Sequence, residues 1–321
     1  MRRTVIPWVA AFAVFALATV GGVALANATV FSAGSFVRIY LDAIARGDAK
    51  SALGLPGVDD TEASVAVLDP DALTGIDLLQ QVSDVDLGGD VHRVAYSWAS
   101  PGGSGTSEFL VERVGTRFGL FPEWGFAVSP TATISLTVSH DSEFFVNSLQ
   151  ADTEQDSDEA IDYALFVPGE YTFGHQSSFL TAEPQLIVAV TPASHLSATI
   201  DVEANDDFVE QVQEKVDAYL DECATQEVLF PTGCPFGQPI ENRVVSTPEW
   251  SIVAYPEVRV EAGAEFDTWT VPSTPGIAHL VVDVQSLFDG SISTFDEDVP
   301  FEVDYLITFT GPSTITIEES P

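Results

Sequence analysis

An uncharged apolar segment at the start of the chain is its most constraining feature. The segment from Val5 to Ala26 contains 22 residues and no charge. As an α-helix it would be about 33 Å long, enough to cross a hydrocarbon core of about 30 Å. A cleavable leader usually has an apolar stretch of only about 7–15 residues. The length therefore favours a transmembrane helix that stays in the bilayer.

The charges that flank this segment predict its orientation. Arg2 and Arg3 come directly before it, and the first acidic residue after it is Asp42. By the positive-inside rule, we expect the N-terminus in the cytoplasm and the rest of the chain outside the cell membrane. The side chains that we expect to anchor the span in lipid are an interfacial aromatic residue and three apolar ones, Trp8, Phe12, Phe15 and Leu17.

Cleavage of the segment is the alternative interpretation. Ala24-Leu25-Ala26 has the A-x-A pattern of a signal-peptidase site, and a cut after Ala26 would release a secreted protein. Both interpretations export the chain from residue 29 onward. A buried helix of a soluble protein would need a core that surrounds a helix apolar on every face.

The charge balance excludes one class of partner. The chain has 11 basic and 49 acidic residues, a net charge of −38. A nucleic-acid binder needs cations that displace counterions from phosphates, so we exclude DNA and RNA. The acidity is typical of a soluble extracellular surface. The alternative is that it attracts a cationic ligand or partner.

Periodicity divides the exported chain into three parts. In residues 31–128, apolar residues from Phe36 to Ile44 share one helical face, Gly47 ends that helix, and Asp48 caps a second one. A short helix around Ile76–Val82 and then three strands are expected. Residues 129–197 alternate apolar and polar residues, as strands do. Residues 198–321 begin with an amphipathic helix capped by Asp207 and continue with strands at Trp250–Tyr255, Val258–Ala262, Phe266–Val271, Ile277–Ser286 and Phe301–Thr310.

Three short motifs carry resemblances. FVRIYLDAIARGDAKSAL (36–53) resembles the opening helices of the cone-shaped domains of the nuclear transport factor 2 family. LFVPGEYTF (165–173), with a Pro-Gly turn, resembles the small β-domain of the TcaA-like membrane proteins of Gram-positive bacteria. CATQEVLFPTGCPFGQPI (223–240) is similar to a motif of single-span extracytoplasmic proteins of actinobacteria.

Periodicity and the apolar segment predict an α+β fold in which residues 1–30 form a cytoplasmic stub and signal-anchor. The resemblances add the expected domain types and a role. Residues 31–128 and 198–321 would be cone-shaped domains of helices on an antiparallel sheet, flanking a small all-β domain at 129–197. The implied role is non-enzymatic and associated with the cell envelope.

Cys223 and Cys234 are the two cysteines, and both lie in the exported part. Export makes a disulfide the expected state, which would close a loop of about 12 residues. Free thiols and a metal site are the alternatives, but two thiols alone do not complete a tetrahedral zinc site.

No catalytic motif emerges. The acidic segment 152–162 offers oxygen ligands for weak Ca²⁺ binding at Asp152, Glu154, Asp156 and Asp158, but it departs from the EF-hand pattern. A solvated acidic loop is the favoured interpretation, and no other cofactor is expected.

We therefore predict an anchored binding or scaffold protein that contacts the bilayer through its N-terminal helix and an envelope protein or cationic ligand elsewhere. One alternative is a ligand-binding or enzymatic pocket lined by Tyr40, Asp42, Tyr96 and Trp98. The other is a Ca²⁺-dependent adhesive or sensor module. The sequence predicts no oligomeric state.

Overall fold

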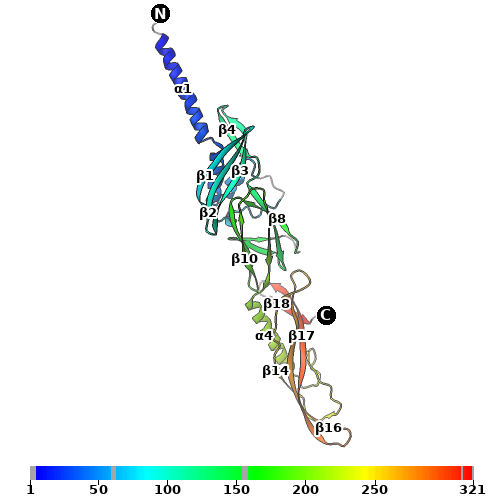
Figure 1. Ribbon diagram of the computed structural model, residues 1–321. Coiled ribbons are helices and arrows are strands. Elements are labelled where there is room, and N and C mark those ends of the chain that lie inside the picture. Colours follow the sequence, from blue (N-terminus) through cyan, green and yellow to red (C-terminus); the bar gives the residue numbers. More distant parts are fainter. Residues whose placement is uncertain (1–4, 59–62, 154–157, 312–313, 320–321) are drawn as a thin grey trace.

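The computed structural model describes residues 5–58, 63–153, 158–311 and 314–319, and the side chains from residue 12 onward. Arg2, Arg3 and the side chain of Trp8 lie outside this description. The molecule is elongated, with helix α1 (Val5–Thr29) projecting from one end (Figure 1). A long hairpin of β16 (Trp269–Gln285) and β17 (Ile292–Gly311) forms the opposite end. The fold is mixed α+β and consists mostly of sheets, as the sequence predicted at this coarse level.

The part next to α1 places two helices on an antiparallel sheet. Ser32 caps α2 by accepting a hydrogen bond from Ser35 N at 3.2 Å, and the apolar stripe that starts at Phe36 is buried. Gly47 adopts a φ of +69°, and Asp48 then caps α3 through Ser51 N at 3.0 Å. The elements are α2 (Ala33–Ala45), α3 (Ala49–Leu53), β1 (Asp77–Gly88), β2 (Val91–Ser100), β3 (Gly103–Arg117) and β4 (Phe121–Phe126), with sheet order β1-β2-β3-β4.

The helix expected around Ile76–Val82 is wrong, because this segment begins strand β1. Gln80 pairs with Ser97 and Gln81 pairs with Tyr96 on β2. Backbone pairing with a neighbouring strand outweighs the weak local helix preference here, since strand formation depends strongly on tertiary context.

The middle of the chain forms two sheets. One has the order β12-β10-β9-β6-β7 and the other β11-β5-β8, in which β11 and β5 are parallel. Pro168 and Gly169 do not form a hairpin, because the strands on either side belong to different sheets. The elements are β5 (Thr131–Ser139), β6 (Glu143–Val146), β7 (Leu149–Asp152), β8 (Ile161–Phe166), β9 (Gly169–Gln176), β10 (Leu180–Ala189), β11 (His195–Asp201), β12 (Glu203–Ala204) and, before them, the 3-10 turn η1 (Pro70–Ala72).

In the last part, α4 (Asp206–Ala224) packs against a sheet built on β16 and β17. Asn205, and not the predicted Asp207, caps α4, since its side chain accepts a hydrogen bond from Phe208 N at 2.9 Å. The strands expected at Phe266–Val271 and Ile277–Ser286 are one continuous strand, β16. The remaining strands are β13 (Arg243–Val244), β14 (Glu249–Ala254), β15 (Glu261–Ala262) and β18 (Thr314–Glu319).

Among the described residues, two hydrophobic cores hold these parts together. The first lies between α2, α3 and the sheet of β1 to β4, and it includes Ala164 and Phe166 from β8. The second runs without interruption from the middle sheets to α4, β16 and β17. Packing therefore continues across the boundaries that we expected near residues 128 and 197. The division into separate domains stays a prediction.

Candidate functional site

Helix α1 is the best candidate for a functional element. Its segment Phe12–Thr29 is long and apolar enough to cross a membrane, and none of it is buried against the rest of the protein. The predicted anchor side chains Phe12, Phe15 and Leu17 are exposed. A helix that is apolar on every face is stable in lipid but not in water. A signal sequence has the same placement, so cleavage after Ala26 stays open.

The end of α1 is attached to the turn between β3 and β4. Asn27 Nδ2 donates a hydrogen bond to the carbonyl of Leu120 at 3.0 Å. Trp124 Nε1 donates to the carbonyl of Phe31 at 2.8 Å, and the rings of Phe31 and Phe121 lie 4.4 Å apart. These contacts join the helix to the sheet, and sequence analysis missed them because they link residues about 90 positions apart.

A polar cavity of about 570 Å³ lies at this junction. Asp84 accepts hydrogen bonds from His92 Nδ1 at 2.7 Å and from Gly34 N at 3.2 Å. The His92 ring meets the edge of Trp124 at 4.9 Å. The other lining residues include Asn27, Ser32, Gln81 and Asp86. The cavity can hold a polar or cationic group, since carboxylates and neutral acceptors dominate its wall.

A second cavity of about 550 Å³ lies between α4, β17 and β18. Tyr219 and Tyr305 meet edge to face at 6.5 Å, and burial raises the pKa of both phenols. Ile315 and Ile317 supply an aliphatic wall, while Lys215 and Glu319 add the charges. Such a lining suits a small ligand with an apolar body and a polar end.

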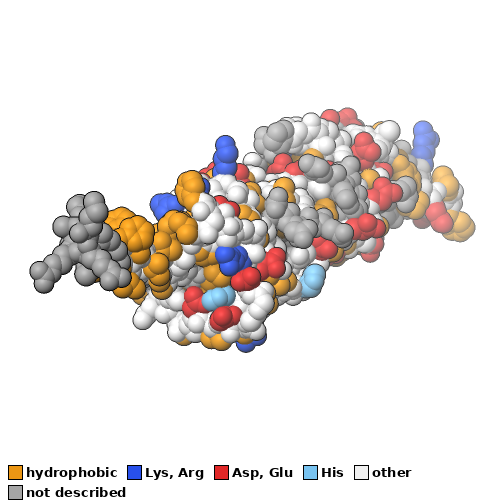
Figure 2. Space-filling view, turned by 90° about the horizontal axis from the view of Figure 1, so that it is seen from above, with side chains coloured by type: hydrophobic (Ala, Val, Ile, Leu, Met, Phe, Trp, Pro, Cys, Tyr) orange, Lys and Arg blue, Asp and Glu red, His pale blue; other side chains and the backbone are white. Residues whose placement is uncertain are grey.

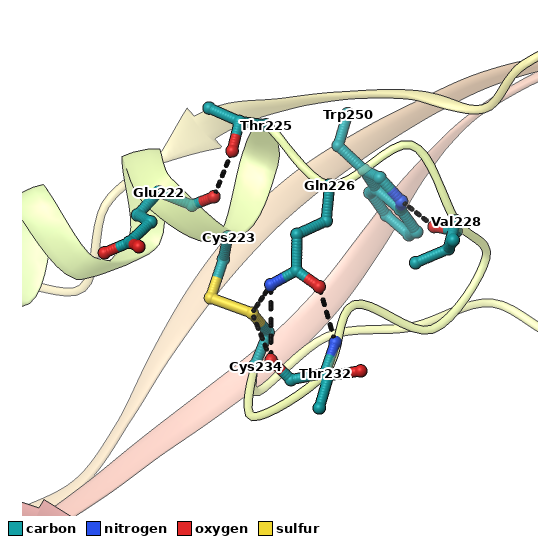
Figure 3. Close-up of a disulfide and its surroundings, with 8 residues drawn as sticks. All are labelled: Glu222, Cys223, Thr225, Gln226, Val228, Thr232, Cys234 and Trp250. Atoms are coloured by element: carbon teal, nitrogen blue, oxygen red, sulfur yellow. Dashed lines mark hydrogen bonds between the residues drawn. A yellow bond between two sulfur atoms is a disulfide. The ribbon is translucent and has the colours of Figure 1, made fainter.

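Cys223 and Cys234 form a disulfide with a Cα–Cα distance of 5.8 Å (Figure 3). Gln226 fills the enclosed loop: its Oε1 accepts from Thr232 N at 2.8 Å, and its Nε2 donates to Thr232 O at 3.2 Å. Trp250 Nε1 donates to the carbonyl of Val228 at 2.8 Å. The bridge therefore fastens the loop to the C-terminal end of α4, and the Trp250 hydrogen bond fastens it to β14.

The structure describes part of the acidic segment. Glu154 and Asp156 lie outside the described residues. Asp152 accepts a hydrogen bond from Ser142 Oγ at 3.0 Å, and Asp158 accepts one from His140 N at 2.9 Å. Among the residues with described positions, no group of three or more His, Cys, Asp or Glu side chains is arranged to hold a metal ion.

The residues proposed for a cone-shaped pocket are mostly core residues. The Tyr40 hydroxyl donates to Pro130 O at 2.8 Å, the Tyr96 hydroxyl to Gly34 O at 3.0 Å, and Trp98 Nε1 to Ser107 Oγ at 3.0 Å. All three side chains are buried. Asp42 is half-exposed and pairs with Arg38 at 3.5 Å. Their positions serve the packing of the first core.

The comparisons with known proteins give no relative. No protein-family model, no curated protein and no solved structure matches this chain.

Proposed function

We propose that the chain is a single-pass membrane protein whose extracytoplasmic part is a non-enzymatic binding or scaffold module of the bacterial cell envelope. The observation that carries this proposal is the exposed apolar helix α1 at one end of an elongated, acidic molecule. Export also agrees with the disulfide, because such bonds persist in oxidising compartments. The N-terminus would lie in the cytoplasm.

The distribution of charge supports a surface that extends away from the membrane. Residues 31–128 contain six basic and 14 acidic residues, a net charge of −8. Residues 129–321 contain three basic and 35 acidic residues, a net charge of −32. Figure 2 shows most of the visible basic side chains around the part next to α1, whereas acidic side chains occur on both parts. The negative charge of the distal part would be repelled by anionic headgroups. The same charge would attract a cationic partner.

The fold hypothesis remains part of this proposal. A pair of helices on a four-stranded antiparallel sheet supports the expected likeness of residues 31–128 to the nuclear transport factor 2 family. The two sheets of residues 131–204 are compatible with a small β-domain like that of the TcaA-like proteins.

Cell fractionation tests the anchor directly. We expect the full chain in the membrane fraction, resistant to alkaline carbonate, with an intact mass that includes Arg2 and Arg3. Protease added to spheroplasts should digest the exported part. A soluble product that begins at Asn27 would show that the protein is secreted and not anchored. A reporter fused to the C-terminus that is active only in the cytosol would show that the chain is not exported.

Crosslinking in intact cells, followed by mass spectrometry, tests the binding role. We expect a partner that remains bound at low salt and is released as the salt concentration rises, because charge attraction between exposed groups is screened. This result is compared with a variant that has less of the acidic charge. It carries neutral substitutions of Asp296, Glu297 and Asp298, three acidic neighbours on β17. If crosslinking from the exported part reveals no envelope component, the scaffold role is wrong.

A second candidate function rests on the cavity between α4 and β18. Its two tyrosines and two isoleucines favour binding of a small amphipathic ligand. Tyr305→Ala should abolish any ligand-induced rise in melting temperature, whereas Tyr255→Ala, at a tyrosine outside this cavity, should not. Equal effects of the two variants would remove this candidate.

A further inference from the structure

The turn between β3 and β4 is an unusual place for large apolar side chains. The Phe118 side chain is 86% exposed and that of Leu120 is 55% exposed. Phe118 adopts a φ of +54° and Gly119 one of +68°. Two-residue turns with positive φ values favour Asn-Gly or Asp-Gly, and a bulky residue is uncommon there. Packing against the described residues does not account for phenylalanine at this position.

The turn lies beside the end of the proposed membrane span. Leu120 O accepts the hydrogen bond from Asn27, and Phe121 packs on Phe31 directly after α1. In Figure 1 the β4 region extends alongside the lower end of α1. Two contacts therefore hold the turn near the level of the last turn of α1.

The length of α1 places that level at the membrane surface. The helix has 25 residues, so it is about 37 Å long, while a hydrocarbon core is about 30 Å thick. If the core begins near Val5, it ends near Leu25, and Asn27 lies about 3 Å beyond it. A turn bonded to Asn27 then lies in the headgroup layer, from which a phenylalanine side chain reaches the acyl chains.

We propose that this turn, residues 117–121, is a second membrane contact, in which Phe118 and Leu120 insert into the outer leaflet beside α1. The inference rests on the proposed function, because it requires α1 to span the bilayer. The contact would fix the tilt of the exported part relative to the membrane, since a single span by itself can tilt within the bilayer.

Arg117 suits the same position. Its side chain is mostly exposed, and among the described side chains it makes one ion pair, from Nε to Glu123 Oε1 at 3.9 Å. An exposed pair at this distance contributes little. The guanidinium can therefore turn to lipid phosphates while the aliphatic part of the side chain stays near Phe118.

The opposite end of the molecule offers a matched control. Phe288, at the tip of the β16–β17 hairpin, is 100% exposed. It is the same residue type as Phe118, and the hairpin of β16 and β17 that carries it extends to the end of the molecule opposite α1 (Figure 1). Both tips are equally able to carry a label without loss of core packing.

Depth measurements on the full chain test the proposal. Single variants Leu17→Cys, Phe118→Cys and Phe288→Cys would carry an environment-sensitive fluorophore in vesicles of phosphatidylcholine and phosphatidylglycerol that contain nitroxide-labelled lipid. We expect blue-shifted emission and strong quenching at positions 17 and 118, with quenching at 118 several-fold above that at 288. Unchanged melting temperatures would verify that the variants fold.

Each result decides between the two proposals. Quenching at 17 together with equal, weak quenching at 118 and 288 would overturn the second membrane contact and leave the anchor intact. Absence of quenching at 17 would overturn the anchor, and the inference about the turn would fall with it.

Discussion

Removal of the disulfide offers a quantitative test of how the last part of the chain is stabilised. Cys223 and Cys234 are 11 positions apart, so the bridge closes a loop of about 12 residues. Loop closure of this size removes enough entropy from the unfolded chain to stabilise the fold by about 3 kcal/mol at 25 °C. The variant Cys223→Ala/Cys234→Ala should therefore lose about 3 kcal/mol of its free energy of unfolding.

The native contacts of the loop are expected to survive this change. Gln226 still bonds Thr232, and Trp250 still donates to Val228. With an unfolding entropy of about 2.1 cal/mol/K per residue, each 1 kcal/mol lowers the Tm of this 321-residue chain by roughly 1.5 °C, so the expected fall is about 4–5 °C. Tryptophan fluorescence during thermal unfolding of the detergent-solubilised chain measures it, because Trp250 lies against the loop.

A reducing agent provides the matched control. Reduction of the wild type should lower its Tm to that of the double variant, and reduction of the double variant should change nothing. A double variant that melts within about 2 °C of the oxidised wild type would refute the argument from loop entropy.

Two further predictions concern single side chains. Asn205→Ala should lower the free energy of unfolding by about 1 kcal/mol, because it removes the cap of α4, while Asp207→Ala should lower it by only a few tenths of that. Thermal unfolding measures both variants, and the reverse order would indicate that Asp207 is the cap. Hydrogen bonds, first to Asp298 and then to Asp296, raise the pKa of His279 above 6.5. A raised folded-state pKa means that the histidine contributes stability below about pH 6.5 and loses it as the pH rises through the folded value. NMR titration should therefore show a midpoint above 6.5 that returns towards 6.5 in Asp298→Asn, and a normal wild-type midpoint would contradict the ion-pair geometry.

Local patterns predicted the elements whose signal is contained in a short segment. The stripe of Phe36, Tyr40 and Ile44 gave α2, and Asp48 was correctly predicted as the cap of α3. The disulfide between the two cysteines also followed from export. Local reasoning failed at residues 76–82, where β2 provides the partner strand, and at the start of α4, where Asn205 precedes Asp207.

Of the candidate site, only the apolar helix α1 could be predicted from the sequence. An uncharged segment of 22 residues identifies a potential span without any knowledge of its neighbours. The contact between Asn27 and Leu120 joins positions 93 residues apart, so no local pattern encodes it. The exposed turn at Phe118 carries a weak signal in the sequence, namely a phenylalanine where a turn usually has asparagine.

Sequence alone determined the apolar helix, the acidic surface and the alternation of buried and exposed residues along the strands, because each depends only on the order of side chains along one segment. The tertiary structure decided which strands pair, including the parallel neighbours β5 and β11, and which turn meets the end of α1. The physical reason is that backbone groups pair with whatever segment the core brings close, and that core is assembled from parts of the chain far apart in sequence.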